Sequence, residues 1–137
     1  MPFITKQFKF CAAHKYWNDE WSEDKNHEVF EDDVKVHGHN YALDITLKGN
    51  INPGSGFAIN ISSLKKIVNN KVIKFLDHSE IQKDIKWFKN KQPSTENLVL
   101  FIWEQIVDDI TDGAQLYKVK LRETPTIYTE YYGPDGV

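Results

Sequence analysis

Alternating apolar and polar residues predict two β-strands in the first third of the chain. Between Phe3 and His14, the positions that include Phe8 and Phe10 would share one face of a strand. The segment Tyr41–Lys48 alternates more strictly, with every second residue apolar. An apolar face opposite a polar face is typical of a strand with one buried side, so both segments predict strands of a sheet that is covered on one side.

A hairpin and a helix are predicted next. Turn-forming residues crowd positions 52–56, and the short apolar run Phe57–Ile61 would form the second strand of the hairpin. Apolar residues then recur at helical spacing as far as about Phe75, which predicts a helix over this stretch. Its N-terminal cap would be Asn60, Ser62 or Ser63.

The second half of the chain predicts another helix and two strands. The segment Pro93–Asn97 supplies small polar residues and an acid in the first turn, which is typical of a helix start, and this helix should end near Asp112–Gly113. Two strands should follow, Tyr117–Thr124 and about Ile127–Tyr132. Residues 15–36, by contrast, are polar without a clean period and predict a long loop, which in a compact domain is often functional.

These elements place the chain in the α+β class. Strands and helices follow in the order β, β-β, α, α, β-β, which favours an antiparallel sheet with helices packed on one face. We expect one domain, residues 1–137, because a chain of this length can bury a hydrophobic core without splitting.

Composition narrows the classes of partner. The net charge is −3 and Arg122 is the single arginine among 17 basic residues, so the sequence predicts no nucleic-acid binding. One cysteine, Cys11, excludes an internal disulfide framework. The N-terminal residues lack the pattern of a secretory signal, and no run of about 18 apolar residues could span a membrane. We therefore expect a cytoplasmic protein without a membrane partner.

Two histidines, His37 and His39, stand one residue apart before the strand Tyr41–Lys48. In a strand, residues i and i+2 point the same way and lie about 7 Å apart, so both imidazoles could converge on one ion. His14 ends the first strand and would join them if the two strands are neighbours. Three imidazoles without a fourth protein ligand are typical of a catalytic zinc site. The alternative is a pair of polar side chains with ordinary hydrogen bonds, and His27, in the long loop, is expected to be a surface histidine.

Two further positions could belong to a reactive pocket. Asp77 precedes His78 just after a predicted helix, and a carboxylate beside an imidazole can raise its basicity. The alternative for this pair is a helix-end cap at the surface. Glu123 ends the apolar face of the strand Tyr117–Thr124. A buried carboxylate needs a partner, which could be a ligand with adjacent N–H donors or a basic side chain such as Arg122.

Several short motifs together resemble one known family. They occur in the family's order along nearly the whole chain: Phe10–His14, His37–Tyr41, Leu76–His78, Pro93–Leu98 and Glu123–Thr124. The chain thereby resembles the family of 6-pyruvoyl-tetrahydropterin synthase and 6-carboxy-tetrahydropterin synthase.

The resemblance implies a fold, an assembly and a substrate class. The fold would be the tunnelling fold (T-fold), a four-stranded antiparallel sheet with two helices on one face. Subunits would assemble through a β-barrel into a homo-oligomer, commonly a hexamer built as a dimer of trimers, with active sites between subunits. The cofactor would be Zn2+, and the partner would be a small-molecule pterin substrate, 7,8-dihydroneopterin triphosphate.

The same resemblance assigns roles to individual residues. The zinc ligands would be His14, His37 and His39. The substrate-binding residues would be Glu123, which anchors the pterin ring, with Thr95 and Glu96 near the same pocket. The proton-transfer pair would be Asp77 and His78.

One position departs from the family pattern. The third proton-transfer group is usually a cysteine a few residues before the His-Gly-His motif, and Asp33 occupies that place here. Cys11 is not its substitute, because it lies on the opposite strand face from the nearby His14. A related subgroup carries a glutamate there and cleaves the side chain to release a hydroxymethyl-dihydropterin. Asp33 is therefore the candidate catalytic base, with Glu31 or Asp32 as alternatives if the loop register differs.

The leading prediction is a zinc-dependent carbon–oxygen or carbon–carbon lyase acting on the pterin triphosphate. The small, compact chain favours the 6-carboxy-5,6,7,8-tetrahydropterin product of the 7-deazaguanine and queuosine route. The alternatives are the 6-pyruvoyl product, the hydroxymethyl product, and a pterin- or zinc-binding relic without turnover.

Overall fold

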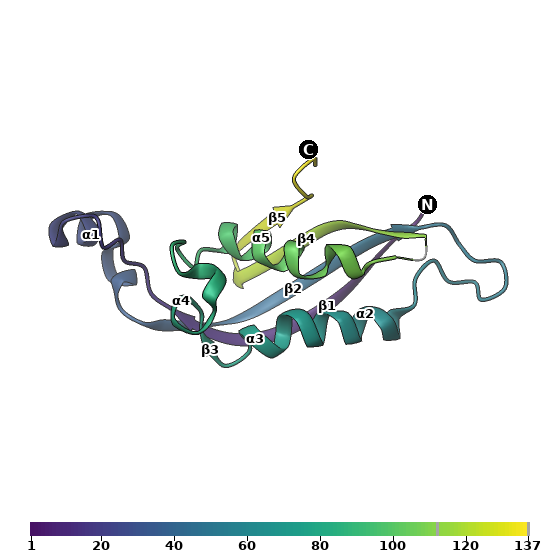
Figure 1. Ribbon diagram of the computed structural model, residues 1–137, viewed down its shortest axis with the longest axis horizontal. Helices are drawn as coiled ribbons and strands as arrows, with labels where there is room; N and C mark the ends of the chain where they lie inside the picture. Colours follow the sequence, from purple (N-terminus) through teal and green to yellow (C-terminus); the bar gives the residue numbers. More distant parts are fainter. Residues whose placement is uncertain (112, 137) are drawn as a thin grey trace.

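The computed structural model describes residues 1–111 and 113–136, and its centre is a five-stranded sheet in the order β3-β1-β2-β4-β5 (Figure 1). The bounds are β1 Phe3–His14, β2 His37–Gly49, β3 Ser79–Glu80, β4 Ala114–Thr124 and β5 Ile127–Tyr131. The predicted α+β class is confirmed, but the predicted count of four strands is wrong. The additional strand, β3, pairs in parallel with β1 over only two residues, which is too short for sequence alternation to indicate.

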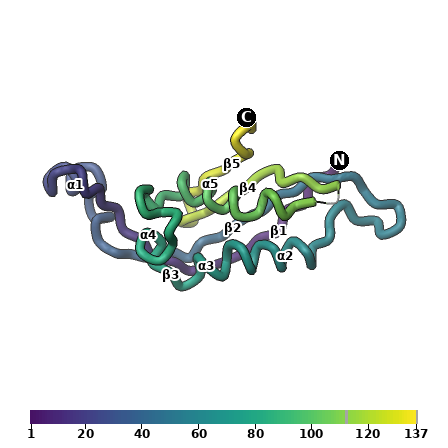
Figure 2. Tube along the Cα trace, viewed as in Figure 1, coloured from purple at the N-terminus to yellow at the C-terminus, as the bar shows by residue number. Residues whose placement is uncertain are grey.

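Helical segments accompany the sheet. The α-helices are α1 Glu23–Phe30, α2 Ile61–Val68, α3 Lys74–Leu76, α4 Ile81–Asp84 and α5 Thr95–Ile106. A π-helix, Asn69–Ile73, joins α2 to α3, so residues 61–76 form one helical run. Short 3-10 helices cover Glu31–Val34, Lys86–Phe88 and Val107–Asp109. The run α2–α3 and the helix α5 lie alongside the sheet, whereas α1 projects at one end of the molecule (Figures 1 and 2). Among the described residues, no helix has the length and apolar character needed to cross a membrane.

The apolar core lies between the helices and one face of the sheet. On β2, Leu43 and Ile45 point to this face and are completely buried. From the other side, α5 contributes Leu98, Ile102 and Ile106, which recur at helical spacing and are also completely buried. The core is therefore built from the two periodicities that the sequence displays.

The opposite face of the sheet is polar. Thr5 Oγ1 lies 2.7 Å from Thr46 Oγ1, and the Gln7 amide donates to Asp44 Oδ1 at 2.9 Å. Cys11 belongs to this face and is exposed, as the alternation predicts. The thiol is thus separated by the sheet from the residues that face the core.

The starts of two helices follow the sequence signals. Asn60 caps α2 and Ser94 caps α5, each through a side-chain oxygen that accepts a backbone N–H. α5 ends at Ile106, earlier than predicted. Two consecutive aspartates follow in a 3-10 helix, and acids are unfavourable beside the negative C-terminal end of an α-helix. The predicted end at Asp112–Gly113 includes Asp112, which lies outside the described residues.

The predicted strand Phe57–Ile61 is wrong. No strand occurs among residues 51–60, and Ile61 is the first residue of α2. The Asn52 side chain accepts from two following backbone N–H groups, so the chain turns without pairing with β2. Phe57 is 66% exposed whereas Ile59, two residues further on, is buried, so the two side chains do not share a buried face as those of a half-buried strand would.

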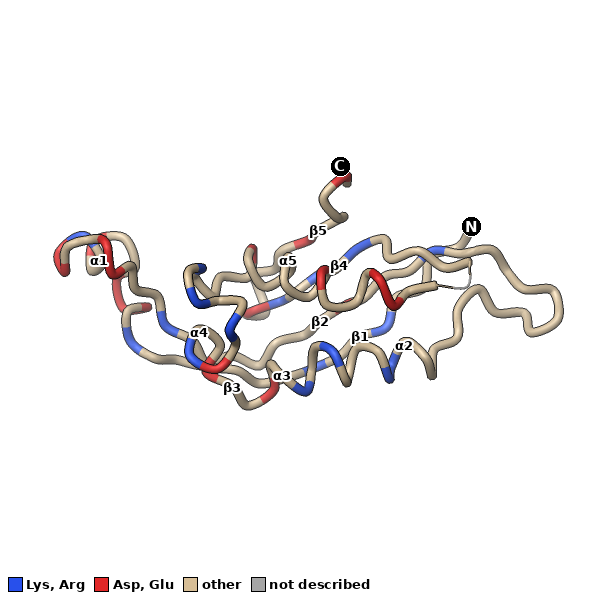
Figure 3. Tube along the Cα trace, in the orientation of Figure 1, with Lys and Arg blue, Asp and Glu red and all other residues tan. Residues whose placement is uncertain are grey.

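Residues 15–36, predicted as an irregular loop, contain α1 and a 3-10 helix. Asn26 is completely buried, and its amide makes three hydrogen bonds with the backbone of this segment. The Phe30 ring stacks between Tyr16 and Trp21, at centroid distances of 5.5 and 5.6 Å. Acidic residues gather around α1 (Figure 3). The helix is short and mostly polar, so it shows no apolar period, and buried amide and aromatic contacts hold it instead.

Candidate metal centre

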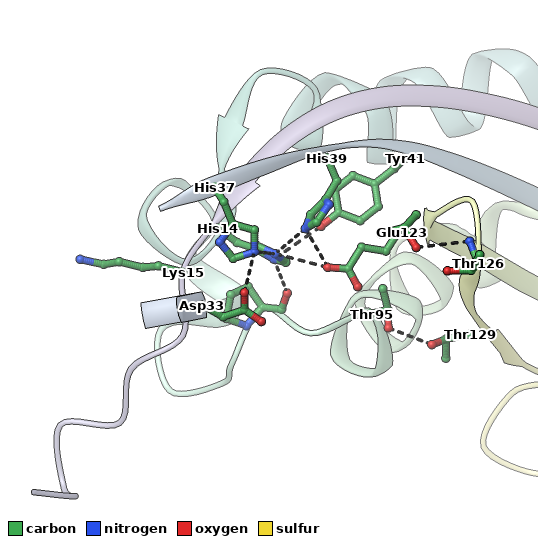
Figure 4. A network of polar contacts seen from close by, with 12 residues as sticks. His14, Lys15, Asp33, His37, His39, Tyr41, Thr95, Glu123, Thr126 and Thr129 are labelled. Carbon is green, nitrogen blue, oxygen red and sulfur yellow. Dashed lines mark hydrogen bonds and ion pairs between the residues drawn. The ribbon is translucent and has the colours of Figure 1, made fainter. Parts of the chain in front are cut away.

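Three histidines meet where β1 ends and β2 begins. His14 pairs with His37 in the antiparallel register, and His39 lies two residues further along β2, on the same face. The Nε2 atom of His14 lies 3.0 Å from that of His37 and 3.2 Å from that of His39 (Figure 4). His14 is completely buried, and the other two are partly buried. The sheet register thus brings together the three predicted ligands, with candidate ligand atoms within 4.8 Å of one another.

Backbone carbonyls fix the orientation of two of the rings. His14 Nδ1 lies 2.9 Å from the Pro93 carbonyl oxygen, and His37 Nδ1 lies 2.8 Å from the Lys35 carbonyl oxygen. Because a carbonyl only accepts, each Nδ1 donates its hydrogen, and a ring in its neutral form then carries the lone pair on Nε2, which faces the other ring. Two lone pairs 3.0 Å apart repel one another unless a proton or a cation joins them. In this neutral form the rings fit a metal ion that accepts nitrogen ligands, such as zinc.

Glu123 joins this polar cluster from β4. Its Oε1 lies 2.9 Å from His39 Nε2 and 3.5 Å from His14 Nε2. The pairing of β4 with β5 shifts between Arg122 and Thr124, and such a bulge re-aims the side chain at its centre. Arg122, the basic partner considered for Glu123, donates instead to the Pro125 carbonyl. The ion-pair contacts of the Glu123 carboxylate among the described residues are with His14 and His39.

The histidines and the carboxylate perturb one another. Hydrogen bonding with His14 lowers the pKa of Glu123, and the charge of a protonated His39 lowers it further, while partial burial opposes both. Burial lowers the pKa of His39 below 6.5, although the Glu123 carboxylate opposes this. An ionised carboxylate and a neutral imidazole are the protonation states in which these groups bind metal ions.

The side of the cluster next to Glu123 is bordered by the start of α5 and by β5. Thr95 is buried. Its Oγ1 donates to Glu96 Oε1 at 2.9 Å, and the same Oγ1 lies 2.8 Å from Thr129 Oγ1. Thr95 and Thr129 lie on the Glu123 side of the histidines, whereas Asp33 lies on the other side (Figure 4). The residues predicted to bind substrate therefore share one side of the cluster.

Asp33 reaches the cluster from the acidic segment. Its Oδ1 lies 3.6 Å from His37 Nε2, and its backbone carbonyl accepts the Tyr16 N–H at 2.9 Å. Among the ion pairs of the described residues, none involves Glu31 or Asp32, and both are exposed. Of the three candidate acids, the fold brings Asp33 to the histidines.

Asp77 and His78 lie apart from the histidine cluster. Asp77 Oδ2 is 3.0 Å from His78 Nδ1, and Asp77 Oδ1 accepts the Cys11 N–H at 2.9 Å, which lowers the pKa of Asp77. His78 adopts a positive φ of 63°, and its N–H donates to the Cys11 carbonyl. The pair thus lies at the edge of β1 beside β3, and no hydrogen bond or ion pair among the described residues joins it to the three histidines.

Two tyrosines that the sequence analysis did not assign border the cluster. The Tyr41 hydroxyl lies 3.5 Å from His14 Nδ1, and the Tyr16 ring lies 5.1 Å from the His14 ring. Burial, and then the nearby Glu123 carboxylate, raises the pKa of both phenols, so both stay protonated. For Tyr41 the available signal was alternation, because it follows His39 by two residues in β2, whereas Tyr16 lies beyond the end of β1, where strand alternation does not apply.

A histidine cluster at the end of a mainly antiparallel sheet, with helices on one face, defines a T-fold protein with a candidate metal centre. The chain belongs to the 6-pyruvoyl tetrahydropterin synthase family, whose sequence model matches residues 3–134. The predicted family is thereby confirmed.

Individual relatives agree with this assignment. A 6-pyruvoyl tetrahydrobiopterin synthase of Drosophila melanogaster is 37% identical over 136 residues, covering 98% of this chain and 81% of the relative. The structure of Caenorhabditis elegans 6-pyruvoyl tetrahydropterin synthase has a TM-score of 0.87 and 31% identity, with 97% of each chain covered. A 6-carboxy-5,6,7,8-tetrahydropterin synthase of Bacillus subtilis is 33% identical over 107 residues, covering 74% of this chain and 71% of the relative. The likeness therefore extends over the whole fold.

Proposed function

We propose that this chain is a zinc-dependent lyase that acts on 7,8-dihydroneopterin triphosphate. The observation that carries the proposal is the convergence of three imidazole nitrogens between two carboxylates, Glu123 on one side and Asp33 on the other. The names of the Drosophila and C. elegans relatives, which refer to pterin synthesis, support the substrate class.

The metal would be held by the Nε2 atoms of His14, His37 and His39. When bound, zinc would make the hydroxyl groups of the substrate side chain more acidic. The carbonyls of Lys35 and Pro93 would hold two of the rings in the tautomer that binding requires.

The two carboxylates would act at opposite ends of the substrate. Glu123 would anchor the pterin ring by accepting from its adjacent N–H groups, with Thr95 and Glu96 beside it. Asp33 would accept a proton from the side chain of the substrate. A substrate that spans the histidine cluster would therefore place its ring toward Glu123 and its reacting carbons toward Asp33.

Asp77 and His78 require a second subunit in this proposal. Within one chain they lie at the edge of β1, apart from the histidines. They would transfer protons in the site of a neighbouring subunit of a homo-oligomer, such as the hexamer of two trimers that the family resemblance implies.

The product is proposed from two different observations. The Drosophila relative matches 98% of this chain and the B. subtilis relative matches 74%, which favours the 6-pyruvoyl product over the predicted 6-carboxy product of the queuosine route. The hydroxymethyl product is a second candidate, because Asp33, and not a cysteine, approaches His37.

Metal analysis tests the metal centre. We expect about one equivalent of zinc in protein purified without added metal, and much less in His37→Ala. A low zinc content that His37→Ala leaves unchanged would overturn the zinc assignment.

Incubation of the zinc-loaded protein with 7,8-dihydroneopterin triphosphate, followed by mass spectrometry, tests the activity. The pyruvoyl, carboxy and hydroxymethyl products differ in mass, and binding without conversion would indicate a relic. Asp33→Ala should lower the rate by about a hundredfold or more, since a positioned general base contributes on that order. Glu31→Ala is the matched control, because Glu31 lies in the same acidic segment without an ion pair to the cluster. Full activity of Asp33→Ala would exclude the carboxylate as the base.

Equilibrium binding of 7,8-dihydroneopterin tests the ring anchor. Glu123→Ala should weaken binding, because the ring N–H groups lose their charged acceptor. Equal affinity of the variant and the native protein would contradict the assignment of Glu123.

A further inference from the structure

The chain leaves the sheet directly after His14. The antiparallel pairing of β1 with β2 ends at the pair His14 and His37, so the backbone groups of the next residues receive no partner from β2. Both backbone groups of Trp17 nevertheless form hydrogen bonds, and the Lys15 N–H also forms one. These bonds come from two glutamine side chains.

The side-chain amide of Gln92 takes the place of a neighbouring strand as the hydrogen-bonding partner of Trp17. The Trp17 N–H donates to Gln92 Oε1 at 3.3 Å, and Gln92 Nε2 donates to the Trp17 carbonyl at 2.8 Å. A primary amide carries a donor and an acceptor in nearly the geometry of a peptide group, so this side chain pairs with Trp17 as a neighbouring backbone would. Gln82 makes a simpler contact, in which its Oε1 accepts only the Lys15 N–H, at 3.1 Å.

The backbone of Gln92 is tied to the histidine cluster. The next residue, Pro93, is buried and its carbonyl accepts the His14 Nδ1–H at 2.9 Å. The carbonyl of Gln92 itself accepts from Asn97 Nδ2 at 2.9 Å, which fixes this turn to the first turn of α5. One residue therefore connects the chain beyond His14 with the carbonyl that orients the His14 ring.

We propose that Gln92 is a positioning residue for the metal ligand His14. The inference rests on the proposed metal centre and adds to it a residue outside the ligand set. The amide clamp on Trp17 keeps the end of β1 at a fixed place relative to Pro93, and this holds the His14 Nδ1–H on the Pro93 carbonyl and the Nε2 lone pair toward the other two rings. Loss of the clamp frees the end of the strand, and the ring spends time in orientations that cannot bind the ion.

The test measures zinc affinity of the full-length protein by competition with a chromogenic chelator. Gln92→Met keeps the length of the side chain and removes both hydrogen bonds, and zinc affinity should fall about tenfold to a hundredfold, as for other partners of metal-bound histidines. Gln82→Met is the matched control, since it removes the hydrogen bonds of Gln82 to Lys15 and Glu80 but leaves the clamp between Gln92 and Trp17 in place, and its zinc affinity should stay within about threefold of the native value. Equal affinity of Gln92→Met and the native protein, or equal losses in both variants, would overturn the inference.

A second variant and a spectroscopic readout cover the case in which Gln92→Met does not fold. Gln92→Glu retains an acceptor for the Trp17 N–H but replaces the donor with a carboxylate oxygen that repels the Trp17 carbonyl, so its zinc affinity should also fall about tenfold or more, and unchanged affinity in it would also count against the clamp. Cobalt substitution reports the ligand geometry directly, and we expect weaker visible absorption bands in Gln92→Glu at saturating Co2+. If the native protein itself binds neither zinc nor cobalt, the metal centre fails and not the role of Gln92 alone.

Discussion

The helix-covered face of the sheet has an apolar half and a polar half, which we call the polar end. The same strands build both halves. Along β2, the residues on this face change from the fully buried Leu43 and Ile45 to His39 and His37 without a break in alternation. Along β4, Glu123 follows the buried Leu121 at the same spacing, with a bulge at the transition. A change of residue type on a continuous backbone thus separates the part of the face that stabilises the fold from the part that can bind a ligand.

The largest effect should come from removing a ligand at the polar end. His39→Ala should lower zinc affinity by about a thousandfold, because zinc sites contribute about 10–16 kcal/mol and one of three protein ligands is lost. The stability of the metal-free protein should change little. Chelator competition and urea unfolding measure the two quantities. His27→Ala is the control, since His27 is exposed on α1 against the Trp17 ring, and a similar loss of affinity in it would contradict the assignment.

In the apolar half, a substitution should instead lower stability and leave zinc affinity nearly unchanged. Leu43→Ala should cost about 3 kcal/mol of unfolding free energy, because a completely buried leucine leaves a cavity. The zinc affinity of the folded protein should stay within about threefold, since effects of separated sites are nearly independent. Urea unfolding of the metal-free variant measures the first quantity. A large loss of zinc affinity in the folded variant would show that the two halves are coupled.

Acid pH should lower the free energy of unfolding of the metal-free protein, because groups at the polar end change their protonation. The folded pKa of His39 is lowered below 6.5, so the unfolded state binds the proton first and stability falls as the pH drops below about 6.5. The folded pKa of Glu123 is lowered below 4.5, so its contribution is present above 4.5 and is lost as the pH falls through the lower folded value. Glu123→Gln should lack this second loss, which we expect to be about 1 kcal/mol. Urea unfolding in the presence of a chelator, from pH 7 down to acid pH, should therefore give a steeper decline below 4.5 in the native protein than in the variant; parallel curves would contradict it.

The smallest effect should arise at the border between the two halves. Tyr41 stacks on Phe10 at 4.8 Å, and its hydroxyl lies 3.5 Å from His14 Nδ1, which is already bonded to the Pro93 carbonyl. Tyr41→Phe keeps the packing and removes this long contact, so zinc affinity should change by less than about threefold. A tenfold loss in the same chelator assay would mean that the hydroxyl, and not the carbonyl, orients the ring.

Much of the fold could be predicted because it depends on local pattern. β1 has the predicted bounds Phe3–His14, and β5 differs from its prediction by one residue. β1 shows an alternation of apolar and polar residues, and β5 is a short run rich in β-branched and aromatic residues after Pro125, so local pattern and composition place both. The prediction of a strand at Phe57–Ile61 failed because a few apolar residues before a helix cap resemble a strand, whereas in the structure the Asn60 side chain caps a helix that begins at Ile61.

The site was predictable to the extent that it follows from strand register. His14, His37 and His39 lie together because β1 and β2 are neighbours in the sheet. The carbonyls that fix the rings and the bulge at Glu123 depend on how distant segments pack, and no residue type marks them in the sequence. For the same reason, the sequence did not indicate that Asp77 lies apart from the histidines within one chain.

The connection between the two ligand-bearing strands has a consequence for how such a protein can evolve. The twelve residue pairs between β1 and β2 hold His14 opposite His37 whatever lies between them. Closing a longer connection is cheap, since a doubling of its length costs about 0.6 kcal/mol. Insertions and substitutions in residues 15–36 can therefore exchange the acid that Asp33 now presents while the three imidazoles keep their places. In the proposed enzyme, metal binding and the choice of base would therefore lie on separate segments, and one could diverge while the other is retained.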